Sequence, residues 1–147
     1  MDAELIARVS PAHRDRLAWF EEHQGDVLPA PGGRLIGRPL VSPAKGIFKP
    51  ADLPYALSIK IMLNSPYEDG VPVPTPGGGW VLEYHEENPR PGRVMTSANE
   101  GMRQCIAERV PVGIIREEPP PRHHTRYNVL SLALPVRWSD PIPRVSR

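Results

Sequence analysis

Two tyrosines and one aspartate have the chemistry to hold a flat ring with polar edges. Tyr67 and Asp69 lie in the segment NSPYEDG, and Tyr84 lies in the later segment WVLEYH. Two aromatic rings can sandwich a nucleobase, while a carboxylate accepts hydrogen bonds from the edge of the base. The pattern predicts a base-binding site built from these three residues. A plainer interpretation stays open, in which both tyrosines are core or interface aromatics and Asp69 only shapes a turn.

The stretch that must position Tyr67 runs from Gly46 to Gly70. Its extended apolar run, Tyr55–Leu63, has apolar residues on both faces, which favours a strand buried on both sides. The segment Trp80–His85 alternates as a second strand and carries Tyr84. The base-binding interpretation requires these two strands to pair as a hairpin, because that pairing brings the tyrosines together.

The sequence lacks the residue patterns of common catalytic and metal sites. No His-x-x-x-His, paired-cysteine or Gly-x-Ser-x-Gly pattern occurs. His123 and His124 are adjacent on a proline-flanked loop, which suits solvent or phosphate better than one metal ion. Glu117 and Glu118 are interpreted as solvated loop carboxylates. We therefore predict a binding domain, not an enzyme, with no catalytic residue, no metal and no cofactor.

Composition favours one soluble domain. The chain has 147 residues, of which 39% are hydrophobic and 24% charged. Its 20 prolines predict many loops and few long helices. The single Cys105 excludes an internal disulfide and favours a reducing, cytoplasmic compartment. No apolar run reaches membrane-spanning length, and the N-terminus does not resemble a signal peptide.

The charge is unevenly spread, although the net charge is only +1. Residues 31–64 and 101–147 are rich in basic side chains. If these two blocks meet in space, they form a surface for an anionic ligand. Charge scattered over a solvated surface explains the same sequence equally well.

Two helices are predicted from their start signals. Ser10 followed by Pro11 predicts a helix that ends at Gly25 and docks through Leu17 and Phe20, with His13 and His23 facing solvent. Ser97, with Glu100 three residues on, predicts a capping box and a helix through Arg109. Met102, Cys105 and Ile106 would face inward on that second helix.

The remaining segments predict strands separated by loops. Extended pieces are expected at residues 34–36, 40–41, 56–63, 80–85, 111–116 and 126–138, the last bent at Pro135. The proline-glycine segment 71–79 is expected to be an exposed hairpin loop. The chain after Asp140 is expected to be frayed or the stump of a linker.

Four blocks, in order, carry a resemblance to a known family. They are KGIFKP with YALSI, then NSPYEDG, then TSANEGMRQC, and finally RVPVGIIRE with RYNVLSLALPVRW. Together they resemble the SRA (SET- and RING-associated) reader of modified DNA bases. The chain looks closest to the SRA-like domains beside HNH nuclease domains in bacterial McrA-type, type IV restriction endonucleases.

The resemblance implies an α+β fold, namely a PUA-like, SRA-like twisted and partly closed β-barrel with flanking helices. Residues 1–30 would form an N-terminal helical segment that packs on the barrel. Residues 31–140 would form the base-binding domain, and residues 141–147 a tail or linker stump.

The resemblance also implies a function and a site. Such domains flip a cytosine out of duplex DNA and test its 5-position, so the partner would be double-stranded DNA carrying 5-methyl- or 5-hydroxymethylcytosine. Any nuclease activity would belong to a fused or associated HNH domain. The residues implied to contact the base are Ser58, Asn64, Ser65, Tyr67, Asp69, Tyr84 and His85. Those expected near the DNA backbone are Lys45, Lys49, Lys60, Arg116 and Arg122, and Asn99 matches a structural position.

Two rival functions remain open from the sequence. A PUA-like module that binds a nucleotide in structured RNA would use the basic loop Arg122–Arg126 equally well. An enzyme acting on a free nucleotide would need Asp69 or Glu83 as acid-base, and no second catalytic partner accompanies either residue.

Overall fold

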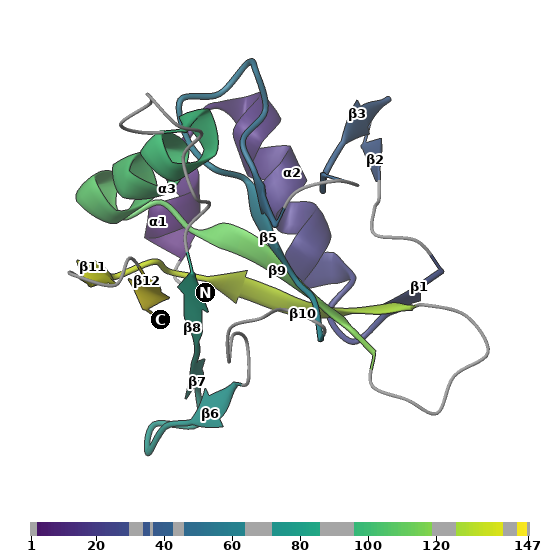
Figure 1. Cartoon of the computed structure of the whole chain (residues 1–147). Coiled ribbons are helices and arrows are strands. Elements are labelled where there is room, and N and C mark those ends of the chain that lie inside the picture. The colour runs from purple at the N-terminus through teal and green to yellow at the C-terminus, as the bar shows by residue number, and fades with distance from the viewer. Residues whose placement is uncertain are drawn as a thin grey trace.

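A mixed five-stranded sheet is the centre of the fold. The computed structural model describes residues 3–29, 34–35, 37–42, 46–63, 72–85, 96–118, 126–139 and 144–146 (Figure 1). The strand order is β1-β10-β9-β5-β4. These strands are β1 (Val27–Leu28), β4 (Ile47–Phe48), β5 (Ser58–Ile61), β9 (Val112–Glu117) and β10 (Tyr127–Ala133). Only the β5–β9 pair is parallel, and the other pairs are antiparallel.

Strand β5 is buried on both faces, as the apolar run predicted. All four of its residues are buried, including Lys60. Its parallel neighbour β9 needs a long crossover connection, and that connection contains the helix α3 (Ser97–Glu108). The two blocks rich in basic residues, 31–64 and 101–147, therefore do meet. They meet where β5 pairs with β9, and this junction lies in the buried core.

The helix α2 (Pro11–Glu22) packs on β9 and β10 (Figure 1). Its predicted start is confirmed, because the Ser10 hydroxyl accepts a hydrogen bond from the His13 amide (3.3 Å). Leu17 and Phe20 are fully buried, as predicted. The Phe20 ring occupies the place that a side chain on Gly113 would fill, so this glycine lets the helix approach the sheet. A short helix, α1 (Ala3–Ala7), precedes α2.

Helix α3 begins one residue earlier than the capping box predicted. Thr96, not Ser97, is the N-cap, and its hydroxyl accepts from the Asn99 amide (3.1 Å). Adjacent threonine and serine both suit this position, and Thr96 has the required extended backbone. Cys105 is buried as predicted, and burial raises its pKa to about 12, so the thiol stays protonated.

A second, three-stranded sheet has the order β11-β12-β8. It contains β8 (Glu83–His85), β11 (Arg137–Ser139) and β12 (Arg144–Ser146). Two hairpins complete the described strands, namely β2 (Arg34–Leu35) with β3 (Arg38–Pro39), and β6 (Val73–Pro74) with β7 (Trp80–Val81). The second hairpin confirms the turn predicted in segment 71–79.

Two predictions of strand pairing are wrong. In the tail, the described residues 144–146 are not frayed, because they form β12, which pairs with both β11 and β8. The segment Trp80–His85 does not pair with β5, because β4 and β9 occupy both edges of that strand. The α+β class is confirmed. Among the described strands no closed barrel forms, and β1, from the N-terminal segment, joins the edge of the main sheet.

Two polar residues predicted to face solvent are instead buried. His13 is 1% exposed, and its ring lies 5.5 Å from the ring of Tyr55. Glu117 is 3% exposed on β9. None of the helices in the described part of the chain is long and apolar enough to cross a membrane.

Candidate nucleic-acid site

Tyr84 lies against the Gly-Ile segment that begins β4. Its hydroxyl occupies the place that a side chain on Gly46 would fill, and its Cζ atom is 2.9 Å from that position. A glycine is therefore required here for the close approach. The Tyr84 side chain is half-buried, and its backbone pairs with Val145 of β12. Two segments expected to share a site thus meet, although not through the expected hairpin.

Backbone hydrogen bonds hold Gly46 in place beneath this tyrosine. The Gly46 carbonyl accepts from the Lys60 amide of β5 (2.7 Å), which extends the pairing of β4 with β5 by one residue. Helix α3 packs beside β4. The main sheet therefore fixes the position of Gly46. Tyr84 belongs to β8 of the three-stranded sheet.

Most of the other predicted base contacts lie outside the described residues. These are Asn64, Ser65, Tyr67 and Asp69, together with Lys45 and Arg122 of the predicted backbone contacts. For His85 the structure describes the backbone, which pairs with Arg144. The last described residue before Asn64 is Leu63, and its amide donates to the buried Glu117 carboxylate (2.9 Å).

Ser58 and Lys60 have structural contacts in place of the expected ligand contacts. Both are buried in β5. The Ser58 hydroxyl donates to the Leu40 carbonyl (2.8 Å), and the Lys60 ammonium donates to the Ser42 carbonyl (3.0 Å). Burial also lowers the pKa of Lys60. The two side chains therefore anchor residues 40–42 against β5.

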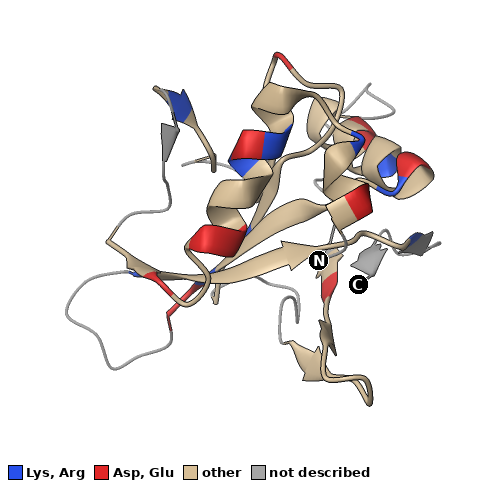
Figure 2. Cartoon of the chain, turned by 180° about the vertical axis from the view of Figure 1, so that it is seen from behind, with Lys and Arg blue, Asp and Glu red and all other residues tan. Residues whose placement is uncertain are grey.

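Lys49 and Arg116 are less buried. The Lys49 stem lies 3.0 Å from the place where a Gly101 side chain would begin on α3, and its ammonium donates to the Pro50 carbonyl (3.4 Å). Arg116 is partly exposed on β9, and Asn99 is buried in α3, which agrees with a structural position. Figure 2 shows acidic and basic positions interleaved on the helices, while the central strands carry few of either.

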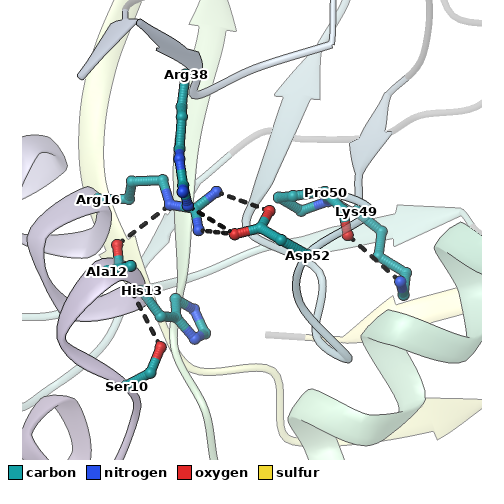
Figure 3. Close-up of polar contacts among 8 residues, drawn as sticks. All are labelled: Ser10, Ala12, His13, Arg16, Arg38, Lys49, Pro50 and Asp52. Atoms are coloured by element: carbon teal, nitrogen blue, oxygen red, sulfur yellow. Dashed lines mark hydrogen bonds and ion pairs between the residues drawn. The ribbon is translucent and has the colours of Figure 1, made fainter. Parts of the chain in front are cut away.

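A charged cluster that the sequence did not predict joins three separate segments (Figure 3). Arg16 of α2 donates twice to the Asp52 carboxylate, at 2.6 and 3.3 Å, and Arg38 of β3 donates to it at 2.9 Å. The hydrogen bond from Arg16 is the largest cause of a lowered pKa at Asp52. His13 lies one helical turn before Arg16. Burial, with the Arg16 charge next, lowers the pKa of His13 to about 4.

A cavity of about 340 Å³ opens on the sheet near the strand that carries Tyr84. Its walls are apolar side chains and backbone, and none of the predicted base contacts among the described residues lines it. The lining residues are Ile59, Gly79, Trp80, Leu82, Val112, Ile114, Leu132, Ala133, Leu134, Pro135 and Val136.

No protein-family model, curated protein or solved structure matches this chain. Within the described residues, no group of three or more His, Cys, Asp or Glu side chains is placed to hold a metal ion. Among the contacts of the candidate site, the close approach of Tyr84 to Gly46 is the most specific.

Proposed function

We propose that this chain reads modified cytosine in duplex DNA, as the recognition part of a type IV restriction system. The observation that carries the proposal is the close packing of the Tyr84 hydroxyl against Gly46. Gly46 belongs to the first block of the SRA resemblance, and Tyr84 is one of the two tyrosines that the resemblance matches to stacking aromatics. The partly closed barrel is part of the same proposal.

A second observation supports the position of the remaining contacts. The Glu117 carboxylate holds the Leu63 amide at the point where the chain leaves β5 toward Tyr67 and Asp69. A hydrogen bond to a buried carboxylate fixes the position of the donating amide, because losing a buried hydrogen bond is costly. In this proposal Tyr67 and Asp69, which follow Leu63 in the sequence, contact the extruded cytosine.

The chemistry of the proposed site is stacking plus edge recognition. Tyr67 and Tyr84 stack on the flipped base, Asp69 accepts from its Watson–Crick edge, and Asn64, Ser65 and His85 surround the 5-substituent. Stacking contributes roughly 1–3 kcal/mol per base, which offsets the few kcal/mol needed to unstack it. The chain itself supplies no reaction step, and cutting belongs to a fused or associated HNH domain.

Fluorescence anisotropy with three duplexes tests this function. The duplexes differ only in carrying cytosine, 5-methylcytosine or 5-hydroxymethylcytosine at one position. We expect at least one modified duplex to bind roughly 10-fold or more tightly than the unmodified one, because only a base whose 5-position fits the pocket stays flipped and gains the stacking contact. Equal affinity for all three duplexes would contradict the proposal. Tighter binding to structured RNA than to any duplex would favour the RNA-binding alternative.

A further inference from the structure

We propose that Arg38 contacts a DNA phosphate beside the base-binding site, an inference that rests on the DNA-binding function proposed above. Arg38 lies on the β2–β3 hairpin, and its side chain is 51% exposed. Its guanidinium donates to an oxygen of Asp52 (2.9 Å), in the turn that follows Pro50 (Figure 3).

Asp52 does not depend on Arg38 for a partner. Arg16 already donates to both oxygens of the Asp52 carboxylate, and the Arg16 side chain is only 3% exposed. A third hydrogen bond, from Arg16 Nε to the Ala12 carbonyl (3.2 Å), fixes the guanidinium on α2. The two arginines on one carboxylate therefore differ in role, since Arg16 is buried and held in place while Arg38 is exposed and redundant.

An exposed and redundant guanidinium can change partner at little loss of stability. Exposed ion pairs contribute little to folding, and the planar guanidinium matches phosphate oxygens as well as carboxylate oxygens. When a DNA phosphate approaches, Arg38 can leave Asp52 without exposing an unpaired charge, because Arg16 still neutralises that carboxylate. Arg16 itself cannot exchange in this way, since its movement would leave a buried charge unpaired.

The surroundings of Arg38 favour an anion. Arg16, Arg38 and Lys49 place three cations around the turn that carries one carboxylate, Asp52 (Figure 3). Lys49 approaches this turn from the side of α3, where its stem lies against Gly101. Lys49 directly follows β4, and Gly46, the residue before β4, contacts Tyr84. The predicted contact at Lys49 thus connects the Arg38 surface to the proposed base site.

Arg38→Ala, measured by anisotropy over a salt series, tests the inference. We expect affinity for both modified and unmodified duplexes to fall roughly 3- to 10-fold at one salt concentration, with the salt slope reduced by about 1. The ratio between the duplexes should stay constant, because phosphate contacts carry no base information. The melting temperature should stay unchanged. Arg38→Lys should keep most of the salt slope.

Arg14→Ala is the matched control, because Arg14 is an exposed arginine on α2 and does not belong to the small sheet that carries Tyr84. It removes the same charge and should change the affinity by less than Arg38→Ala. Equal effects of the two changes, or no effect of Arg38→Ala, would overturn the phosphate contact. Failure of base reading looks different, since the wild type would then bind all duplexes equally and Arg38→Ala would still weaken them all.

Discussion

In the described part of the chain, an aromatic side chain lies over a glycine in two places, and these places differ in what surrounds the ring. Phe20 of α2 covers Gly113 near the start of β9, and it is fully buried. Tyr84 of β8 covers Gly46 at the start of β4, and it is half-buried with a hydroxyl at its tip.

The first contact joins a helix to the central sheet, whereas the second joins the small sheet to the edge of the large one. A ring enclosed on all sides contributes to stability through apolar burial. A partly exposed tyrosine retains accessible ring surface that a ligand can use. The same glycine-aromatic device should therefore support folding at Gly113 and binding at Gly46.

Replacing the rings should give the largest contrast in stability. Phe20→Ala should lower the free energy of unfolding by about 3–5 kcal/mol, because it leaves a cavity in the core. Tyr84→Ala should lower it by less than about 2 kcal/mol, since the ring is only partly buried. Urea unfolding of the two variants measures both values, and equal losses would end the distinction between the two contacts.

Acidification should lower the free energy of unfolding through His13, which lies on the same helix as Phe20. The folded pKa of His13 is about 4, against 6.5 for the ordinary group, because the buried ring disfavours its charged form. The unfolded chain therefore binds more protons between these values. The resulting stability is complete above about pH 6.5 and is lost as the pH falls toward 4, up to roughly 3 kcal/mol.

His13→Leu provides the control for that pH dependence. The variant should show a flatter dependence of unfolding free energy between pH 6.5 and 4 than the wild type does. Asp52 affects mainly the acid end of this range, because the stability that comes from its lowered pKa is lost as the pH falls through the ordinary value of 3.8 and below. An unchanged slope in His13→Leu would show that other groups cause the effect.

Adding one methyl group at each glycine should separate folding from binding. Gly113→Ala meets the buried base of the Phe20 ring and should lower the free energy of unfolding by about 1–3 kcal/mol. Gly46→Ala meets the hydroxyl end of Tyr84, which can swing away, so we expect a loss below about 1 kcal/mol. Only Gly46→Ala should reduce the preference for a modified duplex, and a larger stability loss there would contradict the comparison.

Local patterns predicted the elements on which both contacts depend. The serine-proline start of α2, the spacing of Leu17 and Phe20, and the apolar run of β5 all appear in the structure. Each is set by neighbours within a few residues, so the sequence carries it directly. Even the error at Thr96 was small, because two adjacent hydroxyl residues compete for one N-cap position.

Contacts between distant segments explain what was missed. The burial of Glu117 depends on the amide of Leu63, and the cluster at Asp52 needs Arg16 and Arg38 from two other elements. The pairing of β12 with β8 likewise joins segments that lie far apart in the sequence, so no local pattern predicts it. In the candidate site, Tyr84 approaches Gly46 at the start of the Gly46–Gly70 stretch, although the strand pairing predicted between the two segments was wrong.

The most direct measurement is the affinity ratio between a duplex with one modified cytosine and its unmodified counterpart, taken for wild type, Tyr84→Ala and Phe20→Leu under conditions where all three are folded. We expect a ratio of roughly 10 or more for the wild type and for Phe20→Leu, and a ratio near unity for Tyr84→Ala. A wild-type ratio near unity, or a full ratio retained by Tyr84→Ala, would contradict the role given to the ring over Gly46.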